Sequence, residues 1–152
     1  MTLHHAIKNN DLSMLKELLS KDHLLVNLQD QQGFSPLVLA AYLGNIEAVK
    51  LLIQHGAQVD AKDAQGNTAL MGVSYKGATE VAQVLIAHGA DVNATNNNGS
   101  TPLSFAAIYG NDAMVRFLLQ NGADASMKDQ EGLTPYQQAK QNGHKDIMEI
   151  LA

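Results

Sequence analysis

The sequence contains no cysteine, and no run of apolar residues approaches the roughly 20 that a membrane-spanning helix needs. The absence of cysteine excludes disulfides, Cys-ligated zinc, iron–sulfur clusters and thiol catalysis. The start of the chain also lacks the basic-then-apolar run of a secretory signal. An intact soluble chain is therefore expected, with no membrane partner and a cytoplasmic location.

The net charge of −5 is spread along the chain. When the chain is divided after residues 29, 62, 95 and 128, no segment is net basic. A nucleic-acid-binding protein concentrates Lys and Arg on one face, whereas the 10 basic residues here are scattered among 15 acidic ones. Nucleic acid is therefore not expected as a partner. The 152 residues, 45% of them hydrophobic, suffice for a single compact domain.

The glycines recur at one constant interval, which equals the separation between Gly33 and Gly66. We call this pattern the glycine lattice, and only Gly72 lies outside it. Asp30, Asp63, Asn96 and Asp129 repeat in the same register. The glycines form three series, at positions 33, 66, 99 and 132, at 44, 77, 110 and 143, and at 56, 89 and 122. This internal repeat predicts a solenoid of similar units, each of which buries its apolar face against its neighbours.

Each unit is predicted to contain a short helix, a turn, a longer helix and an extended loop. Thr101 before Pro102 is typical of a helix start, because the hydroxyl caps free N–H groups and the ring presets the helical dihedral. Gly110 then ends the first helix, and Asn111-Asp112 caps the next one. Residues 113–121 carry apolar side chains at helical spacing and form the second helix.

The unit D-x-x-G-x-[ST]-P-L-x-x-A-A-x-x-G-N…V-x-x-L-L-x-x-G-A-D-x-N resembles the ankyrin repeat. The resemblance covers nearly the whole chain and implies an all-α repeat solenoid of stacked helix-turn-helix ankyrin repeats with β-hairpin-like loops. The histidine that the family carries after Pro-Leu is absent, and Val38, Met71, Ser104 and Gln137 stand in its place. The bracing role of that histidine is therefore not expected here.

The resemblance divides one domain, residues 1–152, into five units. Residues 30–62, 63–95 and 96–128 are expected to be full repeats, between an N-terminal capping repeat at 1–29 and a C-terminal capping repeat at 129–152. In the first unit, Asn10 stands where later units have glycine. In the last unit, polar residues replace much of the apolar surface that a further repeat would cover, namely Gln137, Gln138, Lys140, Gln141, Lys145 and Glu149. Because these polar caps oppose end-to-end stacking, a monomer is expected.

The histidines and the repeated carboxylates are interpreted as structural. His55 and His88 share one register, but stacked helices lie about 8–10 Å apart, which is too far for two imidazoles to share a zinc ion. The Asp30 series occupies the position that braces the hairpin in ankyrin repeats by bonding to nearby backbone. A residue repeated in every unit also has nearly the same environment each time, unlike the members of a catalytic pair. The prediction is no catalytic residue, no metal, no cofactor and no enzyme activity.

Function is expected in the positions that vary between units. In ankyrin proteins the binding surface is usually the concave side, formed by hairpin tips and the end of the first helix. Tyr42, Tyr75 and Tyr109 fall just before the turn glycine of their units and form a stripe, and tyrosine is enriched in protein interfaces. The same side chains could instead merely pack the groove between helices. The predicted partner-binding residues are Phe34, Tyr42, Leu43, Asn67, Tyr75, Lys76, Ser100, Ile108 and Tyr109.

The unit 63–95 departs most from the pattern, because Thr68-Ala69 replaces Thr-Pro and Gly72 lies inside the first helix. Either a shallow pocket opens there beside Tyr75 and Met71, or the departure is sequence drift, which is the preferred interpretation. The predicted function is non-enzymatic binding of another protein, as an adaptor, inhibitor or accessory protein similar to compact bacterial proteins made only of ankyrin repeats. The alternative is a scaffold or subunit that senses a small ligand near the unit 63–95.

Overall fold

The computed structural model of the chain describes residues 2–152, and within them it contains ten α-helices, one 3-10 helix and no strand. The α-helices form five consecutive pairs, each joined by a short turn. The pairs are α1 (Leu3–Lys8) with α2 (Leu12–Lys21), α3 (Pro36–Tyr42) with α4 (Ile46–Gln54), α5 (Ala69–Lys76) with α6 (Thr79–Ala87), α7 (Pro102–Ile108) with α8 (Asp112–Gln120), and α9 (Pro135–Gln141) with α10 (Lys145–Leu151). The 3-10 helix η1 (His23–Asn27) follows α2.

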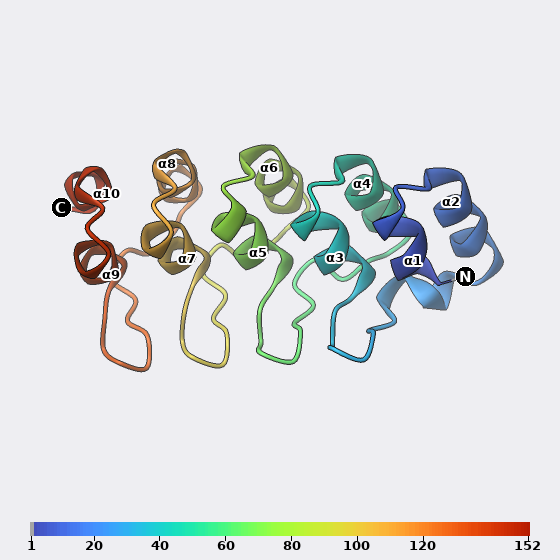
Figure 1. Cartoon of the computed structure of the whole chain (residues 1–152), viewed down its shortest axis with the longest axis horizontal. Coiled ribbons are helices and arrows are strands. Elements are labelled where there is room, and N and C mark those ends of the chain that lie inside the picture. The colour runs from blue at the N-terminus through green and yellow to red at the C-terminus, as the bar shows by residue number, and fades with distance from the viewer. Residues whose placement is uncertain (1) are drawn as a thin grey trace.

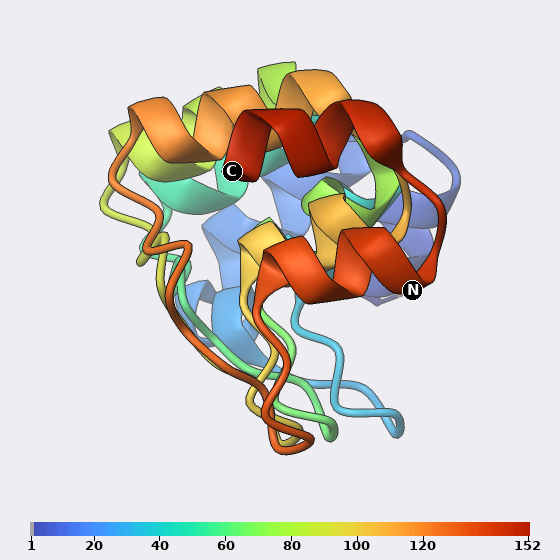
Figure 2. The same ribbon diagram turned by 90° about the vertical axis from the view of Figure 1, so that its left-hand side faces the viewer.

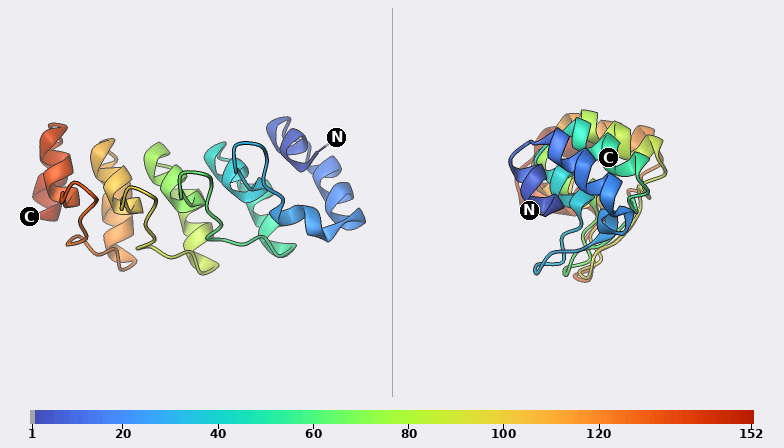
Figure 3. Two further views of the ribbon diagram at one scale, coloured as in Figure 1. Left: turned by 90° about the horizontal axis from the view of Figure 1, so that it is seen from below. Right: turned by 90° about the vertical axis from the view of Figure 1, so that its right-hand side faces the viewer.

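The pairs stack in chain order as two rows of helices, with the termini at opposite ends (Figure 1). Helices α1, α3, α5, α7 and α9 form the inner row, from which the hairpin loops project. The view along the stack shows that these loops all project from one side of the helices (Figure 2), and the view from below shows the regular spacing of the units (Figure 3). Contacts run between neighbours, with α5 packed between α3 and α7. The predicted all-α solenoid is therefore confirmed.

The core lies between the two rows. Leucines of both rows are at most 1% exposed, and they are Leu37, Leu52, Leu70, Leu85, Leu103 and Leu118. Full burial of one such side chain contributes about 1.5–3 kcal/mol, so packing between neighbouring units supplies most of the stabilisation. No helix among residues 2–152 has the length and apolar character needed to cross a membrane.

The inner helices begin at hydroxyl caps, as the sequence predicts. The Thr101 hydroxyl accepts the N–H of Ser104 at 3.2 Å, and Gly110, with φ of +75°, ends that unit's first helix in the left-handed conformation. The predicted capping by the Asn111 side chain is wrong. Asn111 occupies the N-cap position of α8 but makes no side-chain cap bond; its amide donates instead to carbonyl oxygens at the end of α5. Those carbonyls have no partner within their own helix and attract the donor.

The repeated Asp and Asn residues brace the hairpins as predicted. In one hairpin, Asp63 Oδ1 accepts the N–H groups of Gln65 and Asn67, each at 2.9 Å. Asn96 Oδ1 does the same one unit later, at 3.0 and 2.9 Å. The backbone of each hairpin adds the bond from Asp63 N–H to the Asn67 carbonyl at 3.0 Å, or its equivalent. These short loops are hairpin-like turns, and they contain no strand within residues 2–152.

The first unit deviates as its irregular sequence predicts. Asn10, which replaces the turn glycine, adopts the left-handed conformation with φ of +54°. Its Oδ1 accepts a hydrogen bond from the Asn45 side chain at 2.9 Å, which ties the first pair of helices to the second. The following loop, which lacks its glycine, forms η1.

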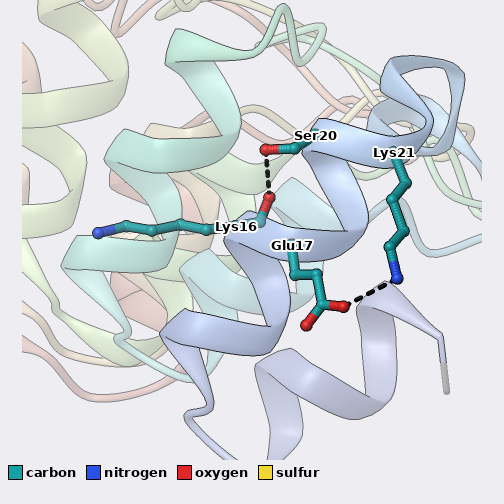
Figure 4. A network of polar contacts seen from close by, with 4 residues as sticks. All are labelled: Lys16, Glu17, Ser20 and Lys21. Carbon is teal, nitrogen blue, oxygen red and sulfur yellow. Dashed lines mark hydrogen bonds and ion pairs between the residues drawn. The ribbon is translucent and has the colours of Figure 1, made fainter.

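A local polar network lies on α2 (Figure 4). Lys21 pairs with Glu17 at 2.8 Å, and the Ser20 hydroxyl donates to the Lys16 carbonyl at 2.8 Å. Each contact joins residues one helical turn apart, and such an exposed ion pair contributes about 0.3–0.5 kcal/mol. The network therefore supports α2 itself and does not form a site.

The last unit corrects one prediction. Gln138, expected on the polar end face, is only 3% exposed, and its Nε2 donates to Asp129 Oδ2 at 2.7 Å. The expectation is wrong because this position of α9 points toward the unit's own hairpin rather than toward a following repeat. The other polar residues of that face are exposed as predicted, namely Gln137, Lys140, Gln141, Lys145 and Glu149.

Candidate functional site

Tyr42, Tyr75 and Tyr109 lie in a row across the ends of α3, α5 and α7, and we call them the tyrosine row. Their exposed fractions are 43%, 41% and 51%. The rings of Tyr42 and Tyr75 are stacked with centroids 6.4 Å apart, and Tyr75 meets Tyr109 edge-on at 4.5 Å. The three rings thus orient one another and still present a large surface to solvent. Contact of these rings with a partner stays a prediction.

Lys76 contacts one ring of the tyrosine row. Its Nζ lies 4.4 Å from the centroid of the Tyr42 ring, within the range of an attractive cation–π contact. The face of Tyr42 therefore already accepts a positive charge from within the chain.

A groove with a volume of about 460 Å³ opens beside the tyrosine row, and we call it the Gly72 groove. It lies among α3, α5, one residue of α7 and the hairpins that precede α3 and α5. Its lining consists of Phe34, Val38, Leu39, Tyr42, Leu43, Asp63, Gln65, Asn67, Thr68, Met71, Gly72, Tyr75 and Phe105. A pocket is therefore present beside Tyr75 and Met71, at the place where the unit 63–95 departs from the repeat pattern.

Gly72 itself occupies an ordinary helical position within α5. A Cβ added there would meet Tyr42 Cδ2 at 3.8 Å and no closer atom outside its immediate chain neighbours and helix backbone. The eleven lattice glycines, in contrast, all have positive φ. The backbone conformation therefore does not require glycine at position 72, and the consequence of this residue is open space in the groove.

The nine predicted binding residues are only partly brought together. Five of them line the Gly72 groove, namely Phe34, Tyr42, Leu43, Asn67 and Tyr75. Lys76 and Tyr109 contact tyrosine rings at its edge. Ser100 and Ile108 are not part of the lining. The Ser100 N–H is held by Asn96 at 2.9 Å, and the Ile108 carbonyl accepts a bond from His144 Nε2 at 2.9 Å.

Sequence reasoning missed other residues of the groove. Asp63 was interpreted as a hairpin brace alone, yet it also lines the groove. Leu39 and Phe105 were not selected, although they lie one repeat before and one repeat after Gly72. Gly72, which lies outside the glycine lattice, was the available signal. Because it has no side chain, the equivalent residues of the two neighbouring repeats are left open to the groove.

Four of the six histidines lie within hydrogen-bonding distance of backbone carbonyls. His55 Nδ1 lies 2.9 Å from the Leu51 carbonyl, and His88 Nδ1 lies 2.8 Å from that of Val84, so both support helix C-termini. His4 Nε2 contacts the Phe34 carbonyl at 2.7 Å, and this contact joins α1 to the hairpin before α3. Among residues 2–152, no group of three or more His, Asp or Glu side chains is placed to hold a metal ion.

Comparisons with known proteins support the repeat pattern. A family model described as ankyrin repeats (3 copies) matches residues 3–96 and 73–152. The human DNA-binding protein RFXANK is 40% identical over 57 residues, which cover 38% of this chain and 22% of that protein. Human ankyrin repeat and SAM domain-containing protein 4B is 39% identical over 57 residues, or 38% of this chain and 13% of that protein.

A third relative is bovine ankyrin repeat domain-containing protein 49. It is 41% identical over 54 residues, which cover 36% of this chain and 23% of that protein. The matched segments span less than a quarter of the length of each of these three relatives. The similarity thus concerns the repeats and not the whole of any relative.

Proposed function

Because the chain belongs to the ankyrin-repeat family, whose repeats are generally protein–protein interaction modules, we propose that it binds a partner protein through the tyrosine row and the Gly72 groove. The partner lies across the ends of α3, α5 and α7 and against the hairpins beside them. The role is that of an adaptor, inhibitor or accessory protein. The protein acts as a monomer in the cytoplasm and without enzyme activity.

One observation carries this proposal: three half-exposed tyrosines, in contact with one another, adjoin a groove lined mainly by apolar side chains. Tyrosine supplies a large contact area with little conformational entropy to lose, and interface hot spots are rich in it. Since the rings already orient one another, a partner meets a preformed surface, which lowers the entropic cost of binding.

The polar groups around the groove suit the rim of an interface. Asn67 and Gln65 line it at the hairpin side, and Asn67 Oδ1 is held by the Asn96 side chain at 2.9 Å. An apolar centre with a hydrogen-bonding border is the usual arrangement of a protein-binding surface. The repeated carboxylates support hairpins, a structural role that favours a binding module over an enzyme.

The test is capture of partners from a lysate of the source organism with the native chain and with the triple variant Tyr42→Ala, Tyr75→Ala, Tyr109→Ala. Retained proteins are identified by mass spectrometry. Affinity for a partner so identified should fall by at least about 2 kcal/mol, while helical content, followed by circular dichroism, stays unchanged. Equal affinity of both chains would refute the site.

The control is the double variant Leu24→Ala, Leu28→Ala. These leucines are 75% and 59% exposed, lie in or beside η1, and do not line the Gly72 groove. Their removal takes away exposed apolar area without touching the proposed surface. The control variant should retain the same partners as the native chain.

A second candidate function is the sensing of a small ligand in the Gly72 groove. Its volume of about 460 Å³ lies within the roughly 300–1,000 Å³ of small-molecule sites. A thermal-shift screen of metabolites tests this candidate, because a ligand that binds the folded chain raises its melting temperature. A hit that is lost when Gly72 is replaced by Leu would favour this function.

A further inference from the structure

The Gly72 groove exists because one side chain is missing from a repeated position. Leu39, Gly72, Phe105 and Gln138 occupy equivalent places, one repeat apart, in α3, α5, α7 and α9. Three of these units fill the place with a long side chain. In the unit that contains Gly72 it is empty, and Leu39 and Phe105 line the space on either side.

The last unit shows what can occupy this place. There Gln138 is buried, and its Nε2 donates to Asp129 Oδ2 at 2.7 Å. Asp129 uses its other oxygen for the hairpin, accepting the N–H groups of Glu131 at 2.9 Å and Leu133 at 3.0 Å. A donor-bearing side chain thus fills the position and satisfies the carboxylate beside it.

Asp63 is the counterpart of Asp129 in the unit that contains Gly72, which has no donor at the position of Gln138. Its Oδ1 also accepts two hairpin N–H groups, and the residue lines the Gly72 groove. Within residues 2–152 no side chain or backbone N–H donates to its Oδ2. A purely apolar occupant would displace water from this oxygen without replacing its hydrogen bond, which is unfavourable.

The walls of the groove indicate which donor fits. Phe34, Tyr42, Tyr75 and Phe105 bring four aromatic rings to its lining, and the Tyr42 face already accepts the ammonium of Lys76 at 4.4 Å. Arginine combines an apolar stem with a planar cation that stacks on aromatic rings and hydrogen-bonds to carboxylates. It is also longer than glutamine, as a side chain that enters from outside must be.

We propose that the Gly72 groove receives an arginine side chain of the partner protein, with the guanidinium on Asp63 Oδ2 and its face against the aromatic wall. Charge favours this occupant, because the chain carries a net charge of −5. The inference rests on the proposed function, since it specifies what a partner inserts into the same surface.

The experiment uses blocked pentapeptides with two glycines on each side of a central residue, which is arginine, lysine or citrulline. Each peptide is titrated into the ¹⁵N-labelled full chain at low salt, and the amide signals of Gly66 and Gly72 are followed by NMR. Citrulline matches arginine in shape but carries no charge. We expect the arginine peptide to shift these signals and the citrulline peptide to bind about tenfold or more weakly.

Two variants test whether the Asp63 carboxylate binds the arginine peptide. Asp63→Asn keeps the hairpin, because Asn96 already makes the same two backbone bonds in its own unit, but it removes the carboxylate. Asp30→Asn is the matched control, since it removes an equal charge from the same register, at a residue that does not line the groove. Arginine-peptide binding should weaken about tenfold or more in the first variant and should be retained in the second.

Several results would overturn the inference. They are the absence of any shift with the arginine peptide, equal affinity for the citrulline or the lysine peptide, and equal loss of binding in the two Asp variants. Gly72→Gln provides a further check, because it places in α5 the side chain that Gln138 provides in α9 and should abolish binding of the arginine peptide. If Asp63→Asn still captures the partner that the triple tyrosine variant loses, the proposed function stands and the arginine assignment fails.

Discussion

The side-chain amide of Asn111 donates a hydrogen bond to the carbonyl oxygen of Ser74 at 2.9 Å, and so fastens the turn of one unit to the helix of the unit before it. It also donates to the Tyr75 carbonyl at 2.9 Å. Asn45 and His144 make comparable links, to Asn10 and to the Ile108 carbonyl. At the same register the unit 63–95 carries Ala78, which has no group to make one. This unit therefore lacks both a link at its turn and the side chain that would close the Gly72 groove.

Replacement of Asn111 by alanine is expected to destabilise the fold by about 1–3 kcal/mol, because two hydrogen bonds worth about 0.5–1.5 kcal/mol each are lost. The free energy of unfolding is measured with urea. Asn121→Ala is the control, since the Asn121 side chain donates only to the Phe117 carbonyl of its own helix. If both variants lose the same stability, the link between units has no special contribution.

Gly72→Ala is expected to stabilise the protein by about 1 kcal/mol, because alanine is preferred over glycine inside a helix. The added Cβ has room, with Tyr42 Cδ2 as its nearest neighbour at 3.8 Å. The opposite sign is expected for Gly110→Ala, since Gly110 has φ of +75° and its Cβ would meet the His144 ring at 2.8 Å. Urea unfolding of the two variants gives the comparison, and a loss of stability in Gly72→Ala would show that the structure requires glycine there.

The sequence predicted those parts of the fold that depend on local backbone geometry, such as the turn at Gly110. A constant repeat period identifies units, turns and caps, because each depends on local backbone geometry that recurs in every unit. Thr101, Gly110 and the Asp30 series were therefore placed correctly. Asn111 and Gln138 were not, because their partners lie in the preceding unit or across the hairpin, and local propensity does not report which of several acceptors a side-chain amide will choose.

The candidate site shows the same limit. The tyrosines were recognised as variable positions on a repeated scaffold, but the groove beside them depends on a side chain that is absent, and its volume depends on how α3, α5 and α7 pack. Asp63 repeats like a scaffold residue and braces its hairpin like one. Its second property, a place in the lining of the groove, follows from the space that Gly72 leaves open beside it.

The loop after α8 contains a carboxyl group whose titration can be checked directly. The pKa of Asp124 lies below its ordinary value of 3.8, because the Ser126 side-chain hydroxyl and then the Ser126 backbone N–H donate to the carboxylate. The distances to Asp124 Oδ1 are 2.6 Å from the hydroxyl and 2.9 Å from the N–H. Ser126→Ala removes the first of these bonds, so the pKa of Asp124 should rise toward 3.8.

The sign of the effect on stability follows from this lowered pKa. A carboxyl group that is more acidic in the folded state stabilises the fold above its unfolded pKa, and this contribution is lost as the pH falls through the folded pKa. Ser126→Ala should therefore lose stability at neutral pH and differ less from the native chain in strong acid. NMR titration of the Asp124 side-chain carbon measures the pKa, and an unchanged value in the variant would contradict the assigned cause.

Lys76 and an incoming arginine compete for one ring face. Lys76 Nζ lies 4.4 Å from the Tyr42 centroid, and its positive charge also repels a cation that approaches the Gly72 groove. Lys76→Met removes both effects, so the arginine pentapeptide should bind about two- to fivefold more tightly, as the release of an exposed cation–π contact of about 0.5–1 kcal/mol implies. Lys50→Met makes the same change in net charge on α4, outside the groove lining. If both variants tighten binding equally, overall charge and not the Tyr42 face governs the affinity.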